Sequence, residues 1–269
     1  ILGNIGQPGP EQLQQAKNIL SSIARFLLDA AHEPTSARAL VYLMLLDRKE
    51  GIRQKQIQAL TTSGESGVLP ELTRLLSKTT VVDPEFRLTL LSLASPQLRQ
   101  LSKPQFDRFS RNLHTLSEFD GRIQPFEWAI VKIIDNSLGK IFSGSSPSVH
   151  GRRELSECRD ALEVVLSVLA YADFKSKLNP DIAFAAGTRE LEGLQLNLQS
   201  KEALSIGLLN TSLERLGALK PLSKPAVLKA CLACIRSDET LAPVELELLR
   251  AIGAALDCPI PPLSTDIDV

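Results

Sequence analysis

A chain of 269 residues with 43% hydrophobic and 23% charged residues can form one large or two medium domains, and it is too apolar for general disorder. Its 30 basic residues balance 31 acidic ones, and no basic stripe carries interleaved aromatic side chains, so the sequence does not favour a nucleic-acid partner. No apolar run reaches the roughly 20 residues of a membrane span, and four cysteines are too few for a disulfide scaffold. The chain begins at Ile1 and its only methionine is Met44, so we expect it to be part of a longer protein.

Leucine and alanine recur throughout the chain while aromatic residues make up only 4%, a composition that suits helix-on-helix packing better than β-sheets. Apolar residues spaced three and four apart predict helices along most of the chain, and no segment alternates convincingly with the period of a strand. Proline or a capping residue precedes several helices, most clearly at Asp83-Pro84-Glu85. The predicted helices span 11–27, 34–50, 53–60, 68–77, 84–98, 103–118, 125–134, 154–172, 180–187, 201–219, 223–236 and 243–257.

Stretches rich in Gly, Pro and Ser divide this array of helices. Residues 1–10 predict a linker, and the Ser-Gly-Ser-Ser-Pro-Ser-Val-His-Gly sequence at 143–151 predicts a second, exposed linker. We therefore expect an N-terminal helical half at 11–142, a C-terminal half at 152–258 and a flexible tail at 259–269. The predicted fold class is all-α, a multi-helical array of about ten to twelve helices in two similar halves.

A repeated sequence pattern favours an internal duplication. The tetrapeptide Leu-Ser-Lys-Pro at 101–104 reappears at 222–225, each time at the beginning of a predicted helix. An acidic turn and a helix with proline near its start follow each copy, and the spacing from Asp120 to Glu127 equals that from Asp238 to Glu245. Together the two similarities predict that the halves are repeats of one helical unit.

Asp120, Glu127, Asp238 and Glu245 are the candidate metal ligands. In the first copy, a glycine follows Asp120 in the turn and Glu127 falls in the first turn of the next helix, so their oxygens could hold calcium or magnesium. The alternative is ordinary helix-entry chemistry, in which the aspartate forms or caps the turn and the glutamate favours the positive end of the helix. In the second copy a glutamate replaces the glycine, which weakens the metal hypothesis there.

The sequence contains no recognisable catalytic motif. Zinc hydrolases place two histidines four residues apart on a helix, but Ser36 occupies the position four residues after His32. Cys231 and Cys234 have the spacing of redox and zinc motifs, yet they fall in an apolar helical stripe without a second pair. Two small buried cysteines are the simpler interpretation. Neither a Gly-x-Ser-x-Gly elbow nor a phosphate-binding loop occurs.

Three stretches resemble parts of a known family. Residues 33–48 read Glu-Pro-Thr-Ser-Ala-Arg-Ala-Leu-Val-Tyr-Leu-Met-Leu-Leu-Asp-Arg, and residues 119–128 read Phe-Asp-Gly-Arg-Ile-Gln-Pro-Phe-Glu-Trp. Both resemble a region downstream of the peptidase domain in bacterial HtpX-like zinc metalloproteases, relatives of the CAAX prenyl endopeptidases, and residues 245–259 fit the same region. The acidic turns also resemble those of TerB-like helical domains, for which acidic metal binding is implied.

The resemblance implies a function that the residues alone do not give: a non-catalytic accessory or regulatory domain of a membrane-bound zinc endopeptidase. The domain would lie on the cytoplasmic side, tethered to the inner membrane through the parent protein. Zinc would belong to the parent's peptidase domain, because the family's zinc-binding His and Glu residues have no counterpart here. The partners would be that peptidase domain and protein substrates or other proteins. The alternative is a free-standing helical adaptor, or a metal-sensing TerB-like module, that is unrelated to proteolysis.

Overall fold

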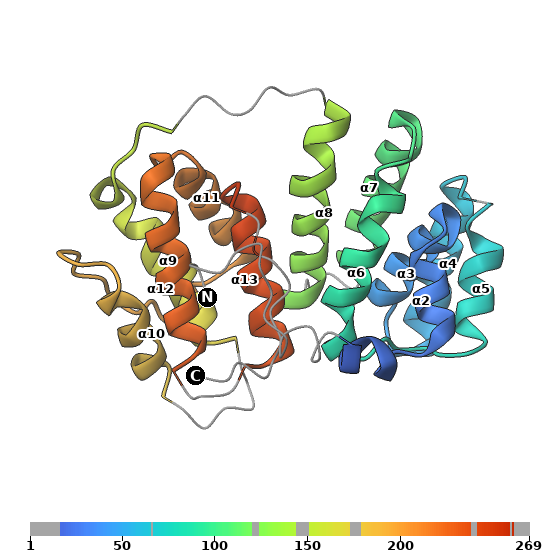
Figure 1. Ribbon diagram of the computed structural model, residues 1–269, viewed down its shortest axis with the longest axis horizontal. Coiled ribbons are helices and arrows are strands. Elements are labelled where there is room, and N and C mark those ends of the chain that lie inside the picture. The colour runs from blue at the N-terminus through green and yellow to red at the C-terminus, as the bar shows by residue number, and fades with distance from the viewer. Residues whose placement is uncertain are drawn as a thin grey trace. The chain divides into compact units, whose positions relative to one another are not determined.

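The computed structural model describes residues 17–65, 67–119, 124–143, 151–172, 179–237, 241–258 and 260. Within these ranges the chain forms twelve α-helices, α2–α13, with short 3-10 turns and no β-strand beyond one isolated bridge between Arg153 and Leu219 (Figure 1). The predicted all-α fold class is therefore confirmed. The predicted linker at 1–10 lies outside the described residues, as do most of the linker at 143–151 and most of the tail at 259–269.

The helices belong to two compact units, divided between residues 122 and 123. Unit 1 contains α2–α7 and unit 2 contains α8–α13. The composition of residues 143–151 predicts the boundary there and so places 125–134 in the first half, whereas the structure groups α8 (Pro125–Ser143) with unit 2. The reason is packing, because α8 lies against α13 (Pro243–Ala255) in the most extensive helix pair of the unit. Loop composition does not carry information on a partner so distant in sequence.

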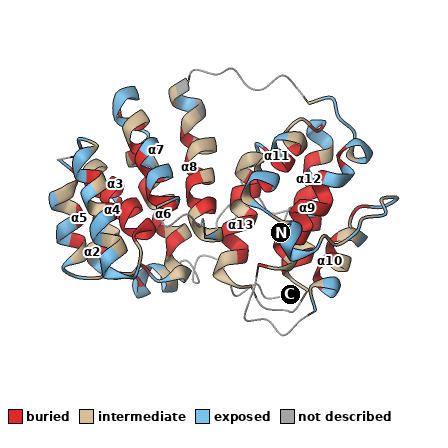
Figure 2. Ribbon diagram, turned by 180° about the vertical axis from the view of Figure 1, so that it is seen from behind, coloured by how far each residue is buried: buried red, intermediate tan, exposed pale blue. Residues whose placement is uncertain are grey.

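Unit 1 is built around α3. Its helices are α2 (Arg25–Ala31), α3 (Pro34–Leu45), α4 (Glu50–Thr62), α5 (Leu69–Leu76), α6 (Pro84–Leu98) and α7 (Lys103–Ser117). Helix α3 packs against α2, α5, α6 and α7, and every residue from Ser36 to Leu45 is buried (Figure 2). A helix buried on all sides forms the interior of a helical array, so α3 is the core of unit 1.

Two buried polar side chains on α3 are paired with carboxylates from the region of α5. The Ser36 hydroxyl donates to Glu71 Oε2 at 2.8 Å, and Arg38 Nη1 donates to Glu65 Oε2 at 3.0 Å. Burial raises the pKa of the Glu65 carboxyl above its ordinary value, and the positive charge of Arg38 opposes that rise. Because an unpaired buried polar group costs about 1–3 kcal/mol, these pairs favour one register of α5 against α3.

Gln56 on α4 joins three elements through one buried amide. Its nitrogen donates to Leu45 O at the end of α3 at 3.2 Å and to Leu116 O near the end of α7 at 3.1 Å. Its oxygen accepts from Asp47 N at 2.8 Å. A single side chain thus satisfies two carbonyls that helix ends leave without intrahelical partners and one N–H of the loop that follows α3.

Unit 2 consists of α8 and the helices that follow it. These are α9 (Arg159–Ala170), α10 (Pro180–Arg189), α11 (Ile206–Gly217), α12 (Lys224–Ile235) and α13. Helix α9 packs against α10, α11 and α12, and α13 packs against α8, α11 and α12. At Gly187 on α10, an added Cβ would lie 2.9 Å from Ala230 O and 3.1 Å from a methyl carbon of Leu166. The absence of a side chain there allows α10 to approach α12 and α9 closely.

The predicted helix at 201–219 is divided in the structure. A 3-10 turn at Lys201–Ala203 precedes α11, which begins after Ser205. The Ser205 hydroxyl accepts from Leu208 N at 3.1 Å and so caps α11. A serine that bonds the backbone in this way favours a new helix start over a continuous helix.

The two copies of the repeated tetrapeptide have different surroundings. Leu101 is buried and Ser102 caps α7 by accepting from Gln105 N at 3.4 Å. In the second copy Leu222 is 95% exposed, and Ser223 makes no side-chain capping bond to α12. Moreover α7 and α8 lie in different units, whereas α12 and α13 share one. The similarity of the two predicted halves stays a prediction.

We expect Gln56→Ala to lower the free energy of unfolding of unit 1 by about 2–4 kcal/mol, because it leaves two buried carbonyls and one half-buried N–H without their partner. Gln54→Ala is the matched control, since Gln54 is an exposed residue of the same helix and bonds only Glu50 in the described structure. It should cost less than about 0.5 kcal/mol. Urea unfolding followed by circular dichroism measures both, and equal losses would contradict the assigned role of Gln56.

Candidate functional site

Glu127 and Glu245, two of the predicted metal ligands, have the same local role. Each is the third residue of its helix and accepts a backbone N–H from just before that helix. The distance is 2.8 Å from Gln124 N to Glu127 Oε2 and 2.8 Å from Ala242 N to Glu245 Oε2. This is the acidic half of a capping box, with proline at the first helical position in both cases. The helix-entry alternative therefore accounts for one oxygen of each carboxylate.

Asp120 and Asp238, the other two predicted ligands, lie outside the described residues. Among the side chains that the structure does describe, no group of three or more His, Cys, Asp and Glu residues could hold a metal ion. The calcium or magnesium site at the acidic turns stays a prediction.

Calorimetric titration with calcium or magnesium at millimolar concentration tests this site, since binding there must weaken in the Asp120→Asn variant.

Cys231 and Cys234 lie on α12 and are both buried, in agreement with the simpler interpretation of their spacing. The Cys234 thiol contacts Leu166 O on α9 at 3.7 Å. Burial raises the pKa of both thiols, that of Cys234 to about 12, with Glu245 adding to the rise there. Both therefore stay protonated at neutral pH and act as small packing residues between α12 and its neighbours.

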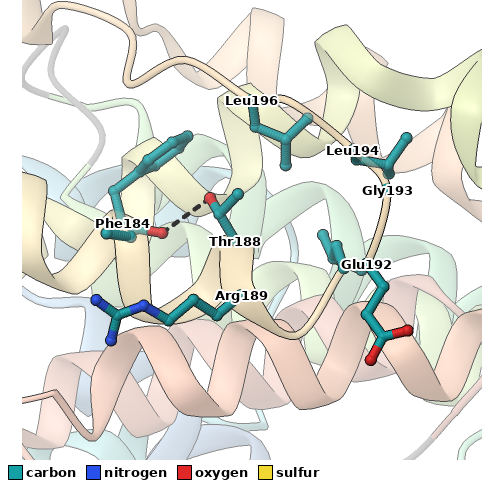
Figure 3. Close-up of a pocket in the computed structure, with 9 residues that line it drawn as sticks. Phe184, Thr188, Arg189, Glu192, Gly193, Leu194 and Leu196 are labelled. Carbon is teal, nitrogen blue, oxygen red and sulfur yellow. Dashed lines mark hydrogen bonds between the residues drawn. The ribbon is translucent and has the colours of Figure 1, made fainter.

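An open cleft of about 470 Å³ in unit 2 is the candidate binding site (Figure 3). Helix α10 forms one wall, and the turn and segment that follow it form the other. Figure 3 shows Phe184 on α10 and Leu194 and Leu196 on the segment that follows, with the charged ends of Arg189 and Glu192 directed away from these three side chains. The full lining comprises Phe184, Ala185, Thr188, Arg189, Leu191, Glu192, Gly193, Leu194 and Leu196. A concave, mainly apolar surface with a few polar groups at its edge is the usual form of a ligand site.

The second wall belongs to a segment that we call the strap, residues 194–199 with the sequence Leu-Gln-Leu-Asn-Leu-Gln. It contains no helix or turn, and it follows Gly193, whose φ of 78° lies in the left-handed region that favours glycine. The side chains of Leu194, Leu196 and Leu198 are half-buried. A tight turn at the glycine thus ends the α10 region and starts an extended run with apolar residues at every second position.

Two side chains on α9 hold the strap. Glu163 Oε1 accepts from Asn197 N at 3.0 Å, and Glu163 Oε2 accepts from the Gln199 side-chain amide at 2.8 Å. Ser167 Oγ accepts from Gln199 N at 2.9 Å. Glu163 is 7% exposed, and besides its ion pair with Arg159 on the same helix this buried carboxylate bonds to the strap.

The spacing of these bonds explains the direction of the strap. Glu163 and Ser167 are four residues apart, which corresponds to about 6 Å along a helix. The amides of Asn197 and Gln199 are two residues apart, which corresponds to about 6.6 Å along an extended chain. The two repeats match, so the strap runs alongside α9 in the same direction with the N–H groups of both residues facing the helix.

The pattern of apolar residues does not predict the cleft or the strap, since it indicates helix or coil between 187 and 219. A signal was present in the leucines at 194, 196 and 198, which alternate with polar residues. That alternation is too short to distinguish a strand from a loop, and the contact with Glu163 that makes it extended comes from more than 30 residues earlier in the chain.

Comparisons of this chain with protein-family models, with curated proteins and with solved structures find no match. In the part of the chain that the structure describes, no helix has both the length and the hydropathy to cross a membrane. The geometry of the cleft and strap is therefore the main structural guide to function.

We expect Glu163→Ala to release the strap, because it removes the acceptor of the Asn197 amide and of the Gln199 side chain. Hydrogen exchange at the amides of Asn197 and Gln199 should accelerate at least about tenfold, and unit 2 should lose about 1–3 kcal/mol. Glu190→Ala is the control, since it removes a carboxylate of the same unit that pairs with Lys229 at the surface. Unchanged exchange in the Glu163 variant would show that the strap does not depend on this carboxylate.

Proposed function

We propose that this chain is a non-catalytic accessory domain of a membrane-bound zinc endopeptidase, on the cytoplasmic side, and that it acts by binding polypeptide. The observation that carries the binding part is the open cleft between α10 and the strap, in which apolar side chains lie next to an extended backbone. The protease part is supported by the resemblance of residues 33–48, 119–128 and 245–259 to the region downstream of HtpX-like peptidase domains.

The resembling stretches coincide with central helices of the two units. Residues 33–48 include the whole of α3, and residues 245–259 include most of α13, which is buried along much of its length. The likeness thus concerns positions that a helical framework constrains. It supports a shared scaffold, and it does not transfer a catalytic residue to this chain.

Several groups that often take part in catalysis have structural roles here. Glu65 pairs with Arg38 inside unit 1, and Glu163 holds the strap. Cys231 and Cys234 are buried packing residues of α12, with thiols that burial keeps protonated. These roles support a binding domain that positions other proteins.

A free-standing helical adaptor is the alternative, and the same cleft would serve it equally well. The coding sequence upstream of Ile1 separates the two proposals. A His-Glu-x-x-His helix and membrane-spanning segments there support the accessory domain, and their absence favours the adaptor. In the first case, removing this domain from the intact protease should change its stability or its choice of substrate.

We expect the purified chain to leave casein intact with and without added zinc. Hydrolysis at a single zinc ion needs about three protein ligands, an open position for water and a general base. The chain has only three histidines, His32, His114 and His150, and none has a second histidine four residues away. Release of labelled fragments from casein measures this. Zinc-dependent cleavage that is lost in His32→Ala or His114→Ala would overturn the non-catalytic assignment.

A further inference from the structure

The strap presents two different backbone edges. In an extended chain the N–H and C=O groups of successive residues point to opposite sides. The amides of Asn197 and Gln199 bond to α9, so the backbone groups of Leu196 and Leu198 point to the opposite edge. Neither Leu196 nor Leu198 forms a backbone hydrogen bond with any part of the chain that the structure describes. One edge of the strap is therefore occupied by the helix, and the other has no hydrogen-bond partner among the residues that the structure describes; we call it the open edge.

The open edge and the cleft share a residue. Leu196 contributes its backbone to that edge and its side chain to the cleft, where Phe184 lies on the wall formed by α10 (Figure 3). An apolar cavity of about 150 Å³ is enough for benzene, so a cleft of about 470 Å³ has room for an aromatic or aliphatic side chain with part of its backbone. Arg189 and Glu192 at the border carry opposite charges, and the cleft therefore does not select a strongly charged ligand.

We propose that the strap binds an extended segment of another protein as an added β-strand, with one apolar side chain of that segment in the cleft. This rests on the proposed function in that it takes polypeptide binding to be the task of the chain. A polypeptide is the ligand whose donors and acceptors repeat at the spacing of the strap and whose side chains alternate between cleft and solvent. A second copy of the strap fits less well, because its own Leu194 and Leu196 already line its own cleft.

The contact with α9 prepares the strap for this role. A free loop would lose conformational entropy when it became a strand, at a cost of about 1–2 kcal/mol for each residue fixed. Here Glu163 and Ser167 already hold the strap extended. Binding then requires ordering only of the incoming peptide, as in other preorganised sites.

The test uses the whole purified chain and a fluorescein-labelled peptide, Lys-Thr-Val-Thr-Leu-Thr-Val-Thr-Lys, with a second peptide that carries Phe at the central position. Fluorescence anisotropy should show saturable binding with a Kd of about 100 μM or tighter. In a nitrogen–proton correlation spectrum, the shifted amides should include those of Leu196 and Leu198. Absence of binding by both peptides to the folded chain overturns the proposal.

N-methylated peptides test strand pairing itself. Methylation of every second amide blocks one edge of the peptide, and methylation of the remaining amides blocks the other. We expect one methylated series to bind at least tenfold more weakly and the other to bind nearly as well as the parent peptide. If both series bind like the parent, the peptide is held only by apolar contacts and strand addition is wrong.

Variants of the chain locate the site. Leu196→Asp places a charge in the cleft, and Ala185→Trp fills the cleft from α10 without changing the strap. Each should weaken peptide binding at least tenfold. Ile182→Asp is the matched control, since Ile182 is 53% exposed on the same helix and does not line the cleft. Circular dichroism verifies that each variant is folded, and equal binding by all variants would place the peptide elsewhere and overturn the proposal.

Sedimentation tests whether a second copy of the chain occupies the strap. Deletion of the chain from a parent protein distinguishes the accessory function from strand addition. If the chain dimerises and Leu196→Asp disperses the dimer, the occupant is a second copy and the proposal fails. If peptide binding fails while deletion of the chain alters a parent zinc protease, the accessory function stands and only strand addition is lost. If peptides bind and no protease lies upstream of Ile1, strand addition stands and the protease assignment falls.

Discussion

The complete burial of α3 is the constraint on which the rest of unit 1 depends. A helix that is buried on every side has to be covered from every side, and four other helices pack directly against it. Its polar side chains then decide how those helices are placed. Arg38 needs Glu65, and the Tyr42 hydroxyl accepts from the Asn112 amide of α7 at 3.1 Å. With apolar packing alone, a neighbouring helix could shift along α3 at little cost. A buried hydrogen bond forms in one position only and therefore fixes the position of that helix.

Unit 2 uses a buried carboxylate for a different purpose. Glu163 projects from α9, pairs with Arg159 of the same helix at 3.4 Å, and accepts its other hydrogen bonds from an extended segment rather than from another helix. Without this contact the strap would be a polar loop with three leucines, and a loop of that kind has many conformations of similar energy. The carboxylate thus changes a flexible connection between α10 and α11 into a fixed wall of the cleft. A structural residue of the core thereby determines the geometry of the surface.

Most helices of this fold could be predicted because their signals are local. Helix α6 is the clearest case, since Asp83 accepts from Glu85 N at 3.0 Å and the predicted 84–98 agrees with Pro84–Leu98. Capping, proline at the first position and apolar spacing all lie within a few residues of one another. The acidic turns carry a local signal as well, and both Glu127 and Glu245 have the helix-entry role that their position favours.

The unit boundary and the cleft could not be predicted in this way, because both depend on contacts between distant residues. Helix α8 joins unit 2 through α13, more than 100 residues later, and the strap becomes extended through Glu163. The strap also departs from a rule that folded proteins usually follow, since open strand edges invite unwanted pairing and are normally short, charged or covered. This one is short and covered on one side, yet its open edge lies beside an apolar cleft and contains uncharged residues only. An extended edge that a buried carboxylate holds in place, next to a cleft with room for a side chain, combines two features that strand-adding proteins use for recognition.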